Sequence, residues 1–228
     1  MKFIFLLTIW LFLYEAQAQI VQWRGPNRDG KFHETGLLKS WPQNGPELIL
    51  TLDSLGTGYS SAQYYKNNIY ITGKIDDEDY ISAYTMNGNR QWRTKYDSAW
   101  FRSYSDSRCT PTIKDDKIYL IGGSGRLACV DARSGNIIWK RDIQTEYEGE
   151  WARFGTGEAP LLVDDLVVAT VGGSKTTMIA LHAADGTPAW QTKSIGGERS
   201  YGSPKLYERN GVQLILGFTS KNVFGINP

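Results

Sequence analysis

Histidine and cysteine, the residues that build most catalytic and metal sites, are scarce in this chain. The 228 residues include two histidines, His33 and His182, and two cysteines, Cys109 and Cys129. These four residues form no Cys/His cluster with the spacing of a zinc site, and no Cys-x-x-Cys-His haem attachment motif is present. The sequence therefore predicts no metal site.

Aromatic and arginine side chains, in contrast, recur in four short runs at residues 58–60, 100–108, 151–158 and 198–201. Tyrosine, tryptophan and arginine dominate binding hot spots. The candidate binding residues are Tyr59, Trp100, Arg102, Tyr104, Arg108, Trp151, Arg153, Glu158, Arg199 and Tyr201. Two interpretations stay open. The runs form a binding face, or the aromatics cap junctions between structural units while the arginines pair with Asp106 or Glu158.

A repeat indicates which elements position these runs. Trp92, Trp139 and Trp190 each follow a glycine by four residues and stand 47 and 51 positions apart. A period of this length is typical of solenoids and propellers. We expect the three indoles to fill the wedge between neighbouring units, which is a structural role.

The second repeat divides into four β-branched or aromatic segments, separated by turns rich in glycine and aspartate. We predict strands at residues 109–114, 117–121, 126–131 and 136–142. Four antiparallel strands per repeat make one propeller blade. The fold class is therefore all-β, with hairpin turns rather than phosphate loops at 122–125 and 172–174.

We place the blade units at about 55–96, 101–145, 153–195 and 199–228, within a propeller region spanning 48–228. Residues 46–52 are predicted to form a lone strand before the first unit. The last unit lacks its expected glycine and tryptophan, which suggests a C-terminally truncated fragment. Cys109 and Cys129 fall on the first and third strands of one blade, about 9.6 Å apart. This exceeds the usual Cα limit of about 7 Å, so we predict no disulfide.

The first eighteen residues have the features of a secretory signal. Lys2 precedes an apolar run at 3–14, and Ala16 and Ala18 suit a signal peptidase. We predict cleavage near Ala18, an extended segment at 19–47, and a periplasmic or extracellular protein without stable membrane insertion. The alternative is an uncleaved anchor or a buried helix. The net charge of +1 lacks the basic field of a nucleic-acid-binding protein.

Three motifs resemble those of exported PQQ-like β-propeller repeat proteins, the pyrroloquinoline-quinone-type repeat family. Residues 22–30 (QWRGPNRDG) and 34–42 (ETGLLKSWP) resemble the family's mature N-terminus, and 131–139 (DARSGNIIW) resembles its blade signature. The resemblance implies a propeller of about eight blades, of which about three and a half are present. It covers both quinoprotein alcohol dehydrogenases and a non-enzymatic outer-membrane assembly lipoprotein, so it does not settle function.

Two functions follow. The first is a non-catalytic binding or scaffolding module without a cofactor, whose partner is a cell-envelope protein, a glycan or a small ligand. The alternative is a fragment of a PQQ-dependent alcohol or sugar dehydrogenase. By resemblance, that enzyme requires an aspartate base, oxygen ligands for Ca²⁺ and often a pair of adjacent cysteines. No residue here matches those motifs one by one, and the two cysteines are not adjacent.

Overall fold

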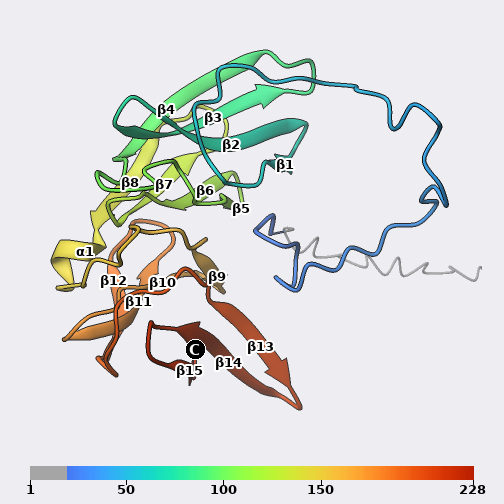
Figure 1. Ribbon diagram of the computed structural model, residues 1–228. Helices are drawn as coiled ribbons and strands as arrows, with labels where there is room; N and C mark the ends of the chain where they lie inside the picture. Colours follow the sequence, from blue (N-terminus) through green and yellow to red (C-terminus); the bar gives the residue numbers. More distant parts are fainter. Residues whose placement is uncertain (1–19) are drawn as a thin grey trace, which may run out of the picture.

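The computed structural model describes residues 20–228; the predicted signal peptide lies outside them. Four antiparallel sheets follow one another along the chain (Figure 1). Blade 1 consists of β1 (Gln63–Tyr65), β2 (Asn68–Ile75), β3 (Glu78–Thr85) and β4 (Arg90–Ser98). Blade 2 consists of β5 (Thr112–Lys114), β6 (Lys117–Ile121), β7 (Arg126–Asp131) and β8 (Ile137–Asp142).

The last two sheets continue the same order. Blade 3 consists of β9 (Leu161–Val163), β10 (Leu166–Thr170), β11 (Thr176–His182) and β12 (Pro188–Lys193). Blade 4 has three strands, β13 (Lys205–Arg209), β14 (Val212–Phe218) and β15 (Val223–Ile226). Within each sheet, every strand pairs with its neighbour in sequence, and the sheets stand side by side around one region (Figure 1). The predicted all-β propeller fold is confirmed.

The first strand of blade 2 is shorter than predicted, because β5 starts at Thr112 and not at Cys109. Pro111 immediately precedes it, and proline has no N–H to give to a ladder. The same arrangement recurs in the next two blades, where Pro160 precedes β9 and Pro204 precedes β13.

The lone strand predicted at residues 46–52 is wrong: no strand forms there. The segment passes the β3–β4 turn of blade 1, and its backbone joins no ladder. Leu50 and Leu52 lie beside Gly88, while Leu48 and Ile49 are 80% and 90% exposed. Arg93 fixes the following turn by donating to the carbonyl oxygen of Ser54.

Two of the repeated tryptophans donate across blade junctions, and the third, Trp190, packs against the cluster that blade 3 shares with Ile215 of blade 4. Trp92 of blade 1 donates from Nε1 to the carbonyl of Ala132 in blade 2 at 3.2 Å. Trp139 of blade 2 donates to the carbonyl of Ala183 in blade 3 at 3.1 Å. Each of these two indoles thereby fixes its blade to the turn of the next one.

Both cysteines are buried and free, so the prediction of no disulfide is confirmed. One short helix, α1 (Ile143–Glu146), was not expected from the sequence. Asp142 caps it by accepting from the amide of Thr145, and Ile143 enters the core between blades 2 and 3. Among residues 20–228, no helix has the length and apolar character needed to cross a membrane.

Candidate functional site

The loops leading into the first strands of the four blades meet at one end of the molecule. They line a cavity of about 430 Å³ that adjoins a second cavity of about 290 Å³; the two share Tyr59, Arg108, Gly157 and Tyr201. We name this site the aromatic cup and define it by Trp23, Tyr59, Tyr104, Arg108, Phe154, Gly157 and Tyr201. Each of the four blades thus contributes to one concave surface.

The aromatic walls of the cup hold one another in place. Phe154 contacts Tyr104 edge-to-face with ring centroids 5.3 Å apart, and its ring lies 6.0 Å from that of Tyr201. The backbone amide of Phe154 donates to the Tyr201 hydroxyl at 3.0 Å. On the other side, Tyr59 donates to a carboxylate oxygen of Asp106 at 3.2 Å. The cup therefore has oriented aromatic faces.

Arg108 is the one charged side chain that lines both cavities. Its Nη1 donates to the carbonyl oxygen of Phe154, while its Nη2 is buried and has no hydrogen-bond partner within the described part of the chain. A guanidinium needs partners for its donors when it leaves water. The cup thus offers a cation behind apolar walls.

Four side chains outside the cavities, Phe101, Arg102, Trp151 and Arg153, form what we name the rim. Arg102 stacks 5.2 Å from the centre of Phe101, and Arg153 stacks 5.3 Å from that of Phe154. Phe101 is 71% exposed and Trp151 is 41% exposed. Aromatic and arginine side chains are therefore presented to solvent around the cup.

The other three predicted site residues lie beneath this surface. Trp100 is 1% exposed and packs against Trp151 with ring centroids 5.3 Å apart. Glu158 accepts from the amide of Thr170 at 2.7 Å. Arg199 donates to the Thr156 hydroxyl at 2.6 Å. All three support the loops and are not available to a partner.

Glu158 and Arg199 are charged groups taken out of water. Burial raises the pKa of Glu158, and the positive charges of Arg199 and Arg28 oppose that shift. Burial lowers the pKa of Arg199, and Glu158 opposes this in turn. No ion pair within 4.0 Å joins an arginine to Asp106 or Glu158 among residues 20–228, although the charges of Arg199 and Glu158 oppose each other's pKa shifts. Asp106 instead accepts from Thr57 and Tyr59.

Sequence reasoning did not assign a structural role to Arg28. This buried side chain donates to the carbonyl oxygens of Ala159, Pro160 and Pro204, and also to the Thr112 hydroxyl. It thereby joins the N-terminal segment to blades 2, 3 and 4, and places Trp23 in the cup. The Trp-Arg-Gly-Pro-Asn-Arg run before the repeats is the sequence feature that could have indicated this role of Arg28.

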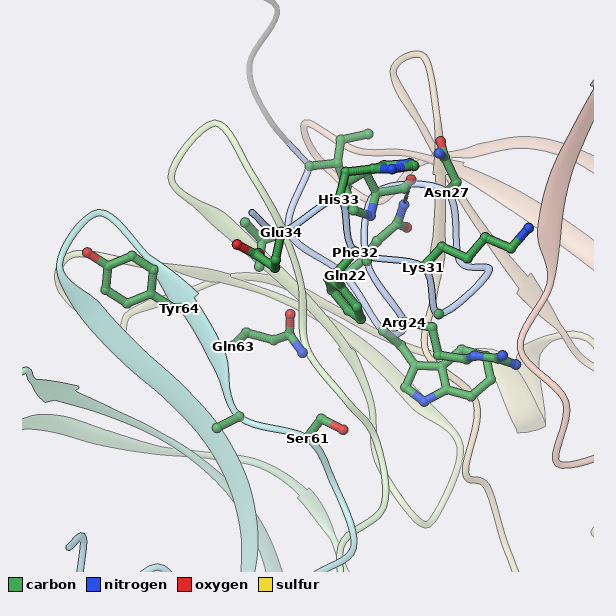
Figure 2. A pocket seen from close by; sticks show the side chains of 17 residues that line it. Gln22, Arg24, Asn27, Lys31, Phe32, His33, Glu34, Ser61, Gln63 and Tyr64 are labelled. Atoms are coloured by element: carbon green, nitrogen blue, oxygen red, sulfur yellow. Dashed lines mark hydrogen bonds between the residues drawn. The ribbon is translucent and has the colours of Figure 1, made fainter. Parts of the chain in front are cut away.

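A larger cavity of about 690 Å³ lies between residues 20–34 and the start of blade 1. Figure 2 shows Gln63 and Tyr64 of blade 1 on one side, with Lys31 and His33 of the N-terminal segment on the other. Most of its lining comes from that one N-terminal segment. It does not combine side chains from successive blades as the aromatic cup does.

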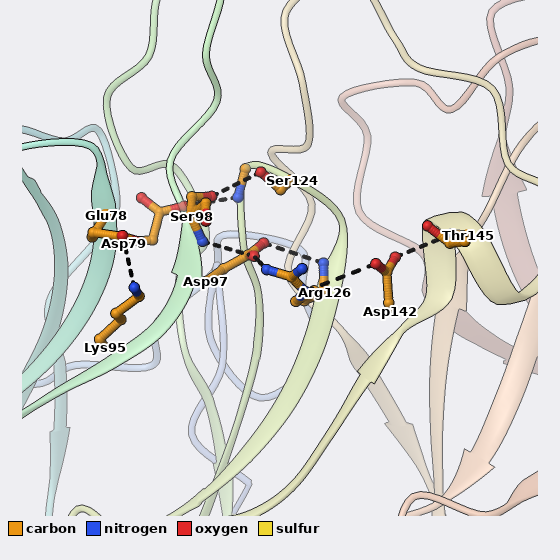
Figure 3. A network of polar contacts seen from close by, with 10 residues as sticks. Glu78, Asp79, Lys95, Asp97, Ser98, Ser124, Arg126, Asp142 and Thr145 are labelled. Carbon is orange, nitrogen blue, oxygen red and sulfur yellow. Dashed lines mark hydrogen bonds and ion pairs between the residues drawn. The ribbon is translucent and has the colours of Figure 1, made fainter.

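A polar network links blades 1 and 2 near the loops (Figure 3). Asp79 accepts from the amide of Gly123 at 2.7 Å, and Asp97 accepts from Arg126 Nη1 at 3.1 Å. Burial raises the pKa of both carboxyl groups to about 6, against the opposing effect of these hydrogen bonds. The two aspartates hold the β6–β7 turn.

Within residues 20–228, no group of three or more His, Cys, Asp or Glu side chains is arranged to hold a metal ion.

Known proteins are similar to this chain in sequence. A family model described as outer membrane protein assembly factor BamB matches residues 77–228. The chain belongs to this family. The BamB proteins of Escherichia coli strain K12 and Salmonella typhimurium strain LT2 are each 29% identical to it over 109 residues, covering 46% of this chain and 26% of the relative. The match therefore spans about a quarter of the length of these curated relatives.

A solved structure with a TM-score of 0.50 shows the same fold. Quinohemoprotein alcohol dehydrogenase ADHIIG from Pseudomonas putida HK5 is similar with a TM-score of 0.50 and 16% identity, covering 74% of this chain and 29% of that protein. BamB from Moraxella catarrhalis has a TM-score of 0.44 and 20% identity, covering 75% and 45%. The resemblance to PQQ-like propeller proteins is confirmed. At this identity the dehydrogenase shows the fold and not the activity.

Proposed function

We propose that the chain is part of an exported, non-catalytic β-propeller that binds a protein of the cell envelope through the aromatic cup and its rim. The observation that carries this proposal is the convergence of loops from four consecutive blades on one aromatic surface. The BamB relatives, described as outer membrane protein assembly factors, support a scaffolding role. Export rests on the predicted signal peptide.

A protein partner suits this surface better than the other ligands we considered. Phe101 and Tyr104 are 71% and 65% exposed, and exposed apolar patches of this kind mark protein interaction sites. Arg102 and Arg153 lie over aromatic rings, which leaves their N–H groups free to donate in the plane of the guanidinium. Large rigid anchors with oriented donors are the composition of protein-binding hot spots.

Site-specific photo-crosslinking in cells tests this function. A photo-reactive amino acid replaces Tyr104 or Tyr201 at the cup, and Tyr64 on β1 serves as the matched exposed tyrosine control. We expect a discrete crosslinked envelope protein from positions 104 and 201 and none from position 64. Absence of a crosslink at both cup positions, or the same product from position 64, contradicts the proposal.

A charge variant tests the rim separately. Changing Arg102 and Arg153 together to alanine removes two stacked guanidinium groups without opening the core. We expect the crosslink yield from position 104 to fall by about tenfold, which corresponds to about 1.4 kcal/mol. Arg133→Ala, at the exposed β7–β8 turn, is the control. An unchanged yield in the double variant excludes the rim from binding.

A further inference from the structure

The aromatic cup is an open hollow whose walls are mostly aromatic. Tyr59, Tyr104, Phe154 and Tyr201 form its walls, and Trp23 closes the smaller cavity. Gly157 has no side chain at the point where the two cavities join. A Cβ there would meet Arg108 and Tyr201 only at 3.5–4.0 Å, so this glycine keeps the space open without being required by backbone strain.

The positive charges of the arginines around the cup favour a negatively charged partner. Among residues 20–228, no ion pair within 4.0 Å involves Arg102, Arg108 or Arg153. The neighbouring carboxylate of Asp106 already accepts hydrogen bonds from Thr57 and Tyr59. Asp79 lies behind Arg108 and is itself buried and bound to Gly123. Three cations thus lie at the site outside ion-pair distance of any carboxylate, with Asp79 and Asp106 as the nearby negative groups.

We propose that the aromatic cup binds an extended acidic segment of a partner protein by taking up one aromatic side chain that lies next to an aspartate or glutamate. The aromatic anchor packs between Tyr59, Phe154 and Tyr201. The adjacent carboxylate pairs with the guanidinium of Arg108, a charge-assisted contact that gains strength at the edge of an apolar cavity. This inference rests on the proposed function, because it names the chemistry of that partner.

A larger side chain at position 157 is expected to fill the cup. In Gly157→Leu the Cβ fits at ordinary contact distances and the rest of the side chain occupies the cavity. Gly225→Leu is the matched control, because Gly225 on β15 is exposed and its Cβ would also meet neighbours only at 3.6–3.9 Å. Arg108→Gln removes the charge while keeping a polar side chain.

A random nine-residue peptide library selected on the full chain tests the inference. We expect enrichment of peptides with an aromatic residue beside Asp or Glu. We expect these peptides to bind Gly157→Leu at least tenfold more weakly and Gly225→Leu unchanged. Arg108→Gln is expected to lose the acidic preference while keeping the aromatic one. Thermal unfolding of each variant establishes that it is folded.

Other outcomes overturn the inference. No enrichment, enrichment of basic or purely aliphatic peptides, or equal binding by Gly157→Leu each contradicts it. A neutral oligosaccharide, maltoheptaose, serves as the glycan probe, and its binding in the cup in place of peptides also contradicts it. If crosslinking from positions 104 and 201 succeeds while no linear peptide is selected, the proposed function stands and this inference fails.

Discussion

At the scale of single residues, Arg28 connects the most distant parts of the chain. Its guanidinium donates to backbone carbonyls at residues 159, 160 and 204, which precede or begin the first strands of two blades. Burial lowers the pKa of Arg28 to about 10, so the group stays charged at neutral pH. A planar fork with five donors suits three converging carbonyls in a way that lysine does not.

Replacing the guanidinium of Arg28 is predicted to destabilise the protein. In Arg28→Met, the buried carbonyl oxygens of Ala159 and Pro204 lose their donor, whereas that of Pro160 keeps the Thr112 hydroxyl. Each buried polar group left without a partner is costly. We expect the free energy of unfolding to fall by about 2–4 kcal/mol. Urea unfolding measures the change, and Arg24→Met, at an exposed arginine four positions earlier, is the control. Equal stability of the two variants contradicts the structural role.

The two cysteines lead to a prediction about reactivity. Burial raises the pKa of Cys109 and of Cys129 to about 12, and the thiolate is the reactive form. We expect a thiol reagent at pH 8 to label neither residue on the timescale that labels an added surface thiol, such as Ser174→Cys. Both natural thiols should react once urea unfolds the chain. Rapid labelling of either one in the folded protein contradicts this packing.

At the scale of elements, the β6–β7 turn depends on two buried carboxylates. The pKa of Asp79 and of Asp97 is about 6, above the ordinary value of 3.8. The folded protein therefore holds protons that the unfolded chain releases between about pH 4 and pH 6. By linkage, the free energy of unfolding falls as pH rises through this window, by up to about 3 kcal/mol for each group.

The variant Asp97→Asn isolates this effect. Asparagine keeps an acceptor near Arg126 but cannot titrate, so we expect the loss of stability between pH 4 and pH 7 to become shallower. Urea midpoints across that range measure it, with the exposed Asp53→Asn as control. A slope identical to that of the unaltered protein shows that Asp97 does not bind a proton in this range.

Local periodicity predicted the strands better than it predicted the contacts between them. The Gly-to-Trp spacing located the blade turns, and the third strand predicted for blade 2, at residues 126–131, coincides with β7. Residues 46–52 have a strand-like composition but pass the β3–β4 turn and join no ladder. The role of Arg28 depends on carbonyls more than 130 positions away, and no local pattern encodes such a contact.

At the scale of the whole molecule, hydrogen bonds between neighbouring blades stabilise the fold. Tyr70 and Trp92 of blade 1 both donate to the carbonyl of Ala132, and Tyr119 and Trp139 of blade 2 both donate to that of Ala183. In each case, two aromatic side chains of one blade bind a single turn of the next. Such nearest-neighbour contacts make a repeat protein cooperative.

A glycine beneath each indole is needed for this contact, and a pair of variants tests it. Gly135 has φ +75°, and a Cβ there would lie 2.6 Å from the Trp92 ring. Gly211 has the same φ of +75° but nothing within 4 Å of a Cβ. Alanine at either position incurs about 1–2 kcal/mol for the left-handed backbone. Only Gly135→Ala must also displace an indole, and overpacking adds about 1–3 kcal/mol. We expect urea unfolding to show a clearly larger loss for Gly135→Ala, and equal losses would mean that the indole does not lock the blades.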